Sequence, residues 1–407
     1  MESEKCKLTE PVILQFPFFI SHFPLPEISV SVPRNFAAQP LSFPDSPGKE
    51  HKMPAPYDAL LIVGFGGPEG PDEVMPFLEN VTRGKPVPRE RLLEVAKHYQ
   101  DFGGISPINQ QVRDLIQVLR PELIRRGIDL PIFWGNRNWH PLLTETVEAM
   151  VDVKIQRVLA FVLAGYSSYS SCRQYRENIE AARQAVGPSA PLIDKVRVFF
   201  NHPDFLEATT DRVANAFARL PTEGRDAAHI AFTAHSIPML MADNCQYSAQ
   251  LTETARLVAE RLEIPADRWR VVYQSRSGRP TDPWLESDIL DHLKTLKEQS
   301  VSQVVIAPIG FLSDHIEVLY DLDDEAGKLS QELGLMMVRA GTVGTHPKFV
   351  AMIVDLIAER LATESAQPCE RKAVGAFGPN HDVCPADCCP YPISRPTAKT
   401  YTSRGVP

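Results

Sequence analysis

Short apolar runs alternate with amphipathic segments along most of the chain. The apolar runs have the length and branched composition of buried β-strands, and they occupy residues 59–65, 131–134, 157–164, 228–233, 269–273 and 303–309. Amphipathic segments with a helical period lie between them, for example at 89–101, 109–120, 205–220, 248–262 and 347–362. This alternation predicts an α/β fold, in which parallel sheets are covered by helices on both faces.

The two ends of the chain lack this alternation. Residues 1–52 are rich in Pro, Ser and Phe and show no period, so we expect a disordered extension or a misassigned start. The patterned part is long enough for two α/β domains, which we place at 53–205 and 206–363. Residues 364–407 form a tail that contains four of the seven cysteines.

The charge balance argues against nucleic acid as a partner. The net charge is −9, from 42 basic and 51 acidic residues, and the sequence has no Lys/Arg block. The apolar stretch at 11–20 covers about ten residues, whereas a helix that spans a bilayer needs roughly 20. It also lacks the pattern of a signal peptide. We therefore expect a cytoplasmic enzyme without a transmembrane segment, and peripheral membrane contact through an apolar cleft mouth stays open.

Two polar segments directly follow the apolar runs at 228–232 and 304–309, and they carry His235 and Glu317. In an open α/β sheet, the residues just beyond the carboxyl ends of the strands line the ligand crevice. We therefore expect the histidine and the carboxylate to face one cleft. The pair combines groups that bind divalent cations and transfer protons.

Glu317 begins an acidic row that continues with Asp321 and Glu325. A spacing of four residues places all three carboxylates on one face of a helix. A solvated helix face would tolerate such a row, but the residues between the acids are largely apolar. We therefore favour a row that leads inward and handles a divalent cation or protons.

The glycine-rich loop 64–70 raises a different hypothesis, an NAD-dependent oxidoreductase, because it follows a predicted strand. In the dinucleotide-binding pattern that starts at Gly64 and Gly66, the third glycine would fall at the position of Glu69. This carboxylate would repel a pyrophosphate, and Pro68 lacks the backbone donor that such a cradle needs. The spacing therefore argues against dinucleotide binding.

Four motifs in this order resemble the ferrochelatase family. They are LIVGFGGPEG at 61–70, HYQDFGGISPIN at 98–109, FTAHSIP at 232–238 and APIGFLSDHIEVLYDLD at 307–323. The resemblance covers about residues 57–362 and implies two similar Rossmann-like halves with a porphyrin cleft between them. It also implies insertion of ferrous iron into protoporphyrin or coproporphyrin in haem biosynthesis. The sequence leaves the choice of porphyrin and the oligomeric state open.

The resemblance assigns roles to residues of this chain. It implies that His235 and Glu317 act on the pyrrole protons and the iron, with Asp321 and Glu325 as a relay. Their division of labour stays open. A non-catalytic porphyrin or haem carrier would not need the acidic row, and chelatases for other divalent metals typically use a second histidine in place of Glu317. Both alternatives are therefore less favoured.

Four further residues are expected at the porphyrin pocket. The resemblance implies that Arg137 lies near the porphyrin, where its guanidinium could pair with a propionate, and it adds Tyr166 to the pocket. Some relatives carry a tyrosine at the position of Glu69, which here is either an oxygen ligand or structural. The resemblance also implies that the loop with Asn109 forms a wall of the pocket. Asn109 is also placed to cap the helix that follows it.

The cysteines of the tail need an explanation. The sequence lacks the two CxxC knuckles of a zinc site, and a cytoplasmic location disfavours disulfides. Some ferrochelatases hold a 2Fe-2S cluster through one internal and three C-terminal cysteines. The resemblance therefore implies the following cluster ligands: Cys172, Cys384, Cys388 and Cys389, with Cys369 as the alternative in the tail. The adjacent pair is awkward because neighbouring side chains diverge in extended backbone, and a disordered thiol-rich tail is the competing interpretation.

Overall fold

A computed structural model describes residues 56–84, 87–277 and 281–391, so the predicted extension 1–52 lies outside the described residues. The described part contains two four-stranded sheets, and all strand pairs within them are parallel. The first sheet has the order β2 (Ile132–Asn136), β1 (Ala59–Gly64), β3 (Arg157–Val162) and β4 (Leu192–Lys195). The second has the order β6 (Trp269–Gln274), β5 (His229–His235), β7 (Gln303–Ala307) and β8 (Met336–Arg339).

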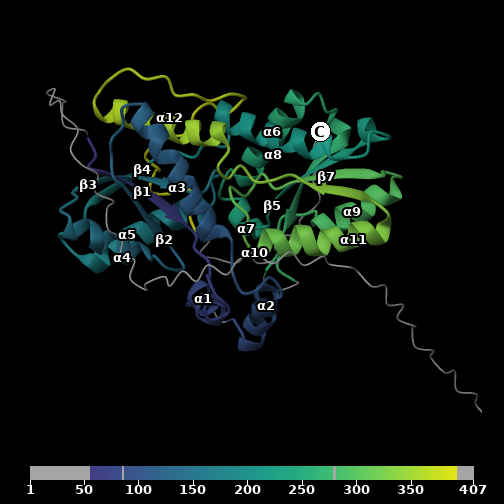
Figure 1. Ribbon diagram of the computed structural model, residues 1–407, viewed down its shortest axis with the longest axis horizontal. Helices are drawn as coiled ribbons and strands as arrows, with labels where there is room; N and C mark the ends of the chain where they lie inside the picture. Colours follow the sequence, from purple (N-terminus) through teal and green to yellow (C-terminus); the bar gives the residue numbers. More distant parts are fainter. Residues whose placement is uncertain (1–55, 85–86, 278–280, 392–407) are drawn as a thin grey trace, which may run out of the picture. The chain divides into compact units, whose positions relative to one another are not determined.

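Helices cover both faces of each sheet, as the alternation of apolar runs and amphipathic segments predicts (Figure 1). The α-helices are α1 (Val74–Val81), α2 (Arg89–Asp101), α3 (Ile108–Arg125), α4 (Leu143–Asp152), α5 (Gln174–Val186), α6 (Pro203–Ala218), α7 (Met239–Ala242), α8 (Tyr247–Arg261), α9 (Ile289–Glu298), α10 (Ile316–Val318), α11 (Ala326–Leu333) and α12 (Pro347–Glu364). The predicted α/β class is therefore confirmed. The domain limits and the cleft between the halves stay predictions.

The central strands are apolar on both faces because both faces are covered. In β1, Leu61 and Val63 pack against α4 and α5, whereas Leu60 and Ile62 point to the opposite side. All six residues of β1 are buried. Successive side chains of a strand alternate between its faces, so a strand buried on both sides has a continuous apolar run rather than an alternating one.

One hydrophobic core is shared by both sheets. It includes Phe161 of the first sheet, Phe232 of the second, and Phe349 of α12. Helix α12 is the last of the described helices but packs against both α3 and α6, and Figure 1 shows it beside them. The two sheets therefore share one continuous apolar core.

Helices α1 and α2 form an excursion, that is, a helical insertion between β1 and α3. Their apolar residues, among them Phe77 and Tyr99, make a separate cluster that also contains Ile316 of α10. His98 of α2 stacks on Tyr320, with 3.7 Å between the ring centroids. The excursion is thereby attached to the segment that carries Glu317.

The tail is packed against the body up to residue 391, although residues 365–391 contain neither helix nor strand. Glu359 of α12 accepts two hydrogen bonds from the buried Arg197, at 2.7 and 3.0 Å, and one from Arg371 of the tail, at 3.1 Å. Arg197 also donates to the carbonyl of Lys372 at 2.8 Å. Removing one partner of such a buried ion pair typically costs about 3–5 kcal/mol. Within the described ranges, no helix combines the length and apolarity needed to cross a membrane.

Candidate functional site

The carboxyl ends of β5 and β7 bring the two predicted catalytic residues together. His235 is the last residue of β5, and Glu317 lies in α10, shortly after β7. The loop after β7 passes directly against β5, where Gly310 donates its backbone N–H to the carbonyl of Thr233 at 3.0 Å. A Cβ atom on Gly310 would lie 2.6 Å from the Cβ of Ala234, so this close approach requires glycine.

His235 and Glu317 face each other across 3.9 Å, measured from Nε2 to Oε2. Their side chains are 36% and 46% exposed, so both remain accessible to a ligand. The Nδ1 of His235 is hydrogen-bonded to the carbonyl of Ser236, which can only accept. This bond assigns the proton of the neutral imidazole to Nδ1 and leaves the Nε2 lone pair directed toward Glu317.

A second histidine lies at the same carboxylate. The Nδ1 of His315 is 3.9 Å from Oε2 of Glu317. Burial, the largest effect, and the neighbouring His235 lower the pKa of His315, although Glu317 and Asp314 oppose this shift. His315 is therefore a neutral base beside Glu317. Sequence reasoning missed this residue, although it stands two positions before Glu317 in the same motif.

The acidic row lies on a continuous helical segment whose middle part is a π-helix. A π-helix, Leu319–Glu325, connects α10 to α11. Asp321 accepts hydrogen bonds from Ser275 Oγ and, at 3.3 Å, from Gln274 Nε2 at the end of β6. Desolvation, followed by the negative charges of Glu317 and Glu325, raises the pKa of Asp321 to about 7. Burial also raises the pKa of Glu325, so both of these carboxyl groups bind a proton more tightly than they would in water.

Asp321→Asn should change how the stability of the protein depends on pH. The pKa of Asp321 is raised from 3.8 to about 7 in the folded protein, so the folded state holds this proton more tightly than the unfolded chain does. The contribution of Asp321 to the free energy of unfolding should therefore fall as pH rises between these two pKa values, and it should stay constant at higher pH. The variant lacks this titration, so its melting temperature relative to the original protein should be higher at pH 8 than at pH 5.

The exposed Asp291→Asn provides a matched control, because its carboxylate pairs with Lys294 on the surface of α9. Melting curves for Asp321→Asn, the control and the original protein should be compared between pH 5 and pH 8. A constant difference between Asp321→Asn and the original protein across this range would contradict a raised pKa of Asp321.

Two residues predicted for the pocket are held by neighbouring side chains. Glu69 forms a two-pronged ion pair with Arg113, whose guanidinium lies 5.2 Å from the centre of the Trp134 ring. Arg137 donates to the carbonyl of Ser170 at 3.2 Å and lies over the rings of Phe65 and Tyr175. Their roles toward a porphyrin stay predictions.

The other two predicted pocket residues are buried. Tyr166 is 2% exposed, and its hydroxyl donates to the carbonyl of Ile309, which ties the first half to the strand end of the second. Asn109 is 0% exposed and donates to the carbonyls of Gly67 and His140, each at 3.2 Å. The prediction that Asn109 caps a helix is wrong. Helix α3 begins one residue earlier, so Asn109 lies inside it and instead ties two loops together.

The predicted cluster cysteines converge at the docked tail. Cys172 lies in a π-helical turn, Tyr169–Arg173, and its thiol lies beside that of Cys389. The sulfurs of Cys388 and Cys389 are 3.7 Å apart, and the sulfur of Cys384 lies within 4.8 Å of that of Cys388. Cys389 has a φ of +48°, and this departure from extended backbone accompanies the approach of the adjacent thiols, which sequence reasoning considered awkward.

Basic residues surround this thiol group. Arg173 donates to the carbonyls of Ala386 and Cys388, both at 2.8 Å, and Arg176 donates to the carbonyl of Cys384 at 3.2 Å. The neighbouring Cys389 thiol, with the charges of Lys195 and Arg176 as smaller contributions, lowers the pKa of Cys172, although burial opposes this shift. A lowered pKa favours the thiolate, which is the form that binds metals.

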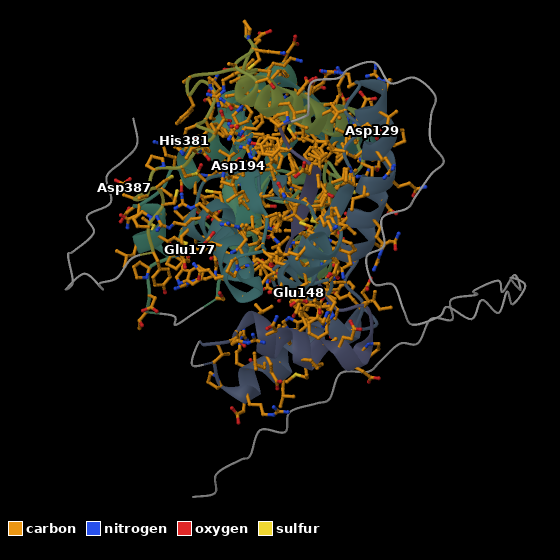
Figure 2. The ribbon with its side chains drawn as sticks, turned by 90° about the vertical axis from the view of Figure 1, so that its left-hand side faces the viewer. Asp129, Glu148, Glu177, Asp194, His381 and Asp387 are labelled. Carbon is orange, nitrogen blue, oxygen red and sulfur yellow. The ribbon has the colours of Figure 1, made fainter. Side chains whose placement is uncertain are left out.

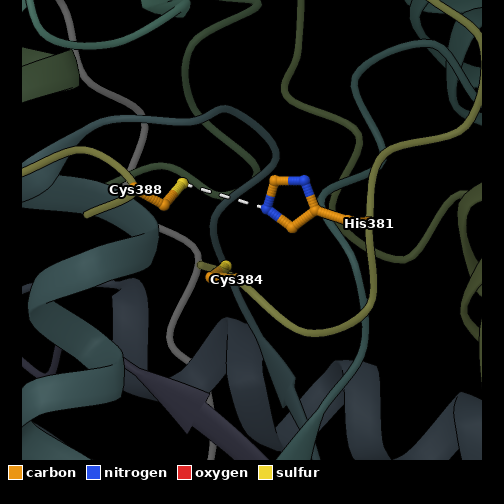
Figure 3. A group of neighbouring side chains, drawn as sticks. All are labelled: His381, Cys384 and Cys388. Atoms are coloured by element: carbon orange, nitrogen blue, oxygen red, sulfur yellow. Dashed lines mark hydrogen bonds between the residues drawn. The ribbon is translucent and has the colours of Figure 1, made fainter. Parts of the chain in front are cut away.

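His381 also faces the thiol group. The side chains of His381, Cys384 and Cys388 point toward one another, with their ligand atoms within 4.8 Å (Figure 3). Figure 2 places His381 and Asp387 of the tail on the same side of the molecule as Glu177 of α5. The alternative ligand Cys369 lies elsewhere, with its sulfur 3.6 Å from the carbonyl of Glu359.

Comparisons with known proteins agree with the motifs. A family model described as Ferrochelatase matches residues 57–361. A ferrochelatase of Rhodopirellula baltica is 54% identical over 344 residues, which cover 84% of this chain and 95% of that protein. A coproporphyrin III ferrochelatase of Streptomyces griseus is 50% identical over 364 residues, which cover 85% and 96%. The solved structure of SirB from Bacillus subtilis with Fe3+ is similar with a TM-score of 0.44 at 14% identity, covering 76% and 97%.

Proposed function

Because this chain belongs to the ferrochelatase family, whose members insert ferrous iron into a porphyrin, we propose that His235 and Glu317 form its catalytic pair. The observation that carries this proposal is the 3.9 Å approach of His235 Nε2 to Glu317 Oε2 at the carboxyl end of β5. The two groups lie at the position where an open α/β sheet binds its ligand. Both are partly exposed, so a porphyrin and an iron ion can reach them.

The chemistry of insertion needs a base and a metal ligand. Free-base porphyrin loses two pyrrole protons when ferrous iron binds its four nitrogens. The free Nε2 lone pair of His235 can accept a pyrrole proton, since its Nδ1 proton is held by Ser236. The carboxylate of Glu317 offers oxygen ligands to the incoming iron and replaces water in its coordination shell. Glu317 takes the second pyrrole proton once the iron has left its carboxylate for the porphyrin nitrogens, and His315, Asp321 and Glu325 can receive that proton or hold iron before transfer.

Coproporphyrin III is the substrate that we propose for this chain. The relative from Streptomyces griseus, 50% identical over most of both chains, is a coproporphyrin III ferrochelatase. Coproporphyrin carries propionates where protoporphyrin carries vinyl groups, so it can form additional charge-assisted hydrogen bonds with arginines such as Arg137. Losing one such bond costs about 1.5–3 kcal/mol, which corresponds to roughly a tenfold or greater loss in kcat/KM.

Steady-state assays of the purified protein with each porphyrin and ferrous ion under anaerobic conditions test this proposal. We expect iron insertion into both porphyrins, with the higher kcat/KM for coproporphyrin III. A higher kcat/KM for protoporphyrin would overturn the proposed substrate and leave the family reaction in place.

We also propose that Cys172, Cys384, Cys388 and Cys389 hold a 2Fe-2S cluster. The donor set fits this group, since a 2Fe-2S cluster takes four thiolates and these four thiols are linked by mutual contacts. When bound, the cluster supplies a one-electron redox centre. Thiol ligands stay reduced and available in the cytosol, so we propose that the enzyme is cytoplasmic.

The cluster should give the protein a measurable composition and colour. Protein purified anaerobically with adequate iron should be red-brown and contain about two irons and two labile sulfides per chain. Cys172→Ser should lose the colour and lower the melting temperature, because cluster ligation joins the tail to the body. Cys369→Ser is the control, since its thiol lies at α12, and it should keep the colour. A colourless original protein with freely titratable tail thiols would refute the cluster.

A further inference from the structure

The segment that carries His315 and Glu317 is held at both of its ends by one arginine. Arg339 is the last residue of the edge strand β8, and its side chain is only 14% exposed. Its guanidinium donates to both carboxylate oxygens of Asp314, at 3.0 and 3.3 Å. It also donates to both carboxylate oxygens of Asp323 in the π-helix, at 2.6 and 3.0 Å. Arg339 therefore fixes the start of the segment relative to the π-helix.

These contacts require an arginine at this position. A guanidinium has five N–H donors in one rigid plane, and four of those of Arg339 go to the two carboxylates. The fifth donates to the carbonyl of Ala340 at 3.4 Å. A lysine ammonium is a compact charge with three donors, so it cannot form a two-pronged pair with each acid at once.

The same point of the chain is also tied to the first half, by Gln111 of α3. The backbone N–H of Asp314 donates to Oε1 of Gln111 at 2.9 Å, and Nε2 of Gln111 donates to the carbonyl of Asp314 at 3.4 Å. Arg339 thus holds the side chain of Asp314 from the second sheet, while Gln111 holds its backbone from the first half.

We propose that Arg339 and Gln111 are positioning residues for iron insertion. Through Asp314, they hold Glu317 at its 3.9 Å distance from His235. This inference rests on the proposed catalytic pair and adds the residues that place it. Helix α10 has only three residues and continues directly into a π-helix, so regular helical hydrogen bonding does little to fix Glu317. Contacts from outside the segment must then determine its position.

Steady-state kinetics of Arg339→Lys test this role. The variant keeps the positive charge but loses the double two-pronged geometry. We expect a loss in kcat of up to about 10²-fold, the cost of misplacing a catalytic group by about 1 Å. The KM for ferrous ion should rise, because a displaced Glu317 binds iron less well, and the KM for the porphyrin should stay unchanged. Partial unfolding lowers kcat through the active fraction but moves neither KM.

Gln111→Leu is a second and milder variant, since it removes both hydrogen bonds to Asp314 without changing a charge. It should lower kcat and raise the KM for ferrous ion to a smaller extent. Because both residues act through Asp314, the double variant should lose less kcat than the product of the two single losses. A loss equal to that product would overturn their shared action.

Arg157→Lys is the matched control. Arg157 also joins two carboxylates, those of Asp194 and Glu364 at 3.0 and 2.9 Å, but it lies at the start of β3 in the first sheet. This variant should keep the kcat and both KM values of the original protein.

The outcomes separate this inference from the proposed catalytic pair. An unchanged kcat and iron KM in Arg339→Lys, together with an inactive His235→Ala, would overturn the positioning role and leave the pair in place. Near-normal turnover in His235→Ala would overturn the pair and this inference with it. Where Arg339→Lys does not fold, Gln111→Leu decides, and an unchanged kcat and iron KM in that variant would refute the positioning role.

Discussion

Replacing His235 with alanine should lower the turnover of iron insertion by about 10²–10⁴-fold, the usual contribution of a positioned general base. The imidazole is the group that we expect to accept a pyrrole proton at Nε2. Its side chain is 36% exposed, so its removal should leave folding intact. Porphyrin affinity should also change little, since binding involves many contacts beyond this ring. Turnover and porphyrin affinity should be measured on the same preparation.

The matched control for this variant is His229→Ala. His229 lies at the opposite end of the same strand, β5, and takes no part in the proposed site. It should retain the turnover of the original protein. Near-normal turnover in His235→Ala would contradict the catalytic assignment of His235, whereas a loss in both variants would indicate damage to β5.

Glu317→Gln should be the most damaging of the three isosteric changes in the acidic row. The amide keeps the shape of the side chain but removes the negative charge that binds iron and the site that accepts protons, so we expect a loss on the order of 10²-fold or more. Asp321→Asn and Glu325→Gln should show milder defects that depend on iron concentration or pH. Turnover should therefore be measured for all three variants over a range of iron concentrations and a range of pH.

Glu332→Gln is the control for charge removal on the same helical segment, because Glu332 is exposed near the end of α11. It should behave like the original protein. Equal and trivial effects for Glu317→Gln, Asp321→Asn and Glu325→Gln would restore the interpretation of the row as a solvated helix face.

The strands that could be predicted from the sequence are the buried ones. Strands β1 and β7 have continuous apolar runs because helices cover both of their faces. Strands β4 and β8 were not predicted. Each has four residues, lies at the edge of its sheet and is partly exposed. Strand β4 ends in Asp194 and Lys195, and the three apolar residues of β8 are too few to distinguish a strand from the end of a helix. Edge strands of this length are defined by pairing with a neighbour, which a local pattern does not record.

The tail shows why other features could not be predicted. Residues 365–391 have no periodicity, and their docking depends on Arg197 and Glu359, which are far apart in the sequence and meet only in the folded core. The π-helical turns that carry Cys172 and Asp321 likewise have no sequence signature of their own. Two π-helices at proposed functional positions agree with the tendency of such turns to occur at functional sites.

The candidate catalytic site was more accessible to sequence reasoning. The positions of His235 and Glu317 after two strands predicted that they would face each other, because strand ends of a parallel sheet meet at one edge. His315 could not be identified from the sequence because it lies between Asp314 and Ile316 and has no spacing from other polar residues that is typical of a site. Only the folded chain shows that its imidazole turns toward Glu317.

A single-turnover measurement tests the central claim most directly. The complex of the enzyme with coproporphyrin III should be formed anaerobically and mixed rapidly with ferrous ion, while the absorbance of the bound porphyrin is followed. We predict rapid conversion to the iron porphyrin in the original protein, and conversion slower by orders of magnitude in His235→Ala with the porphyrin still bound. Equally rapid conversion in both proteins would contradict the proposal that His235 acts in the insertion step.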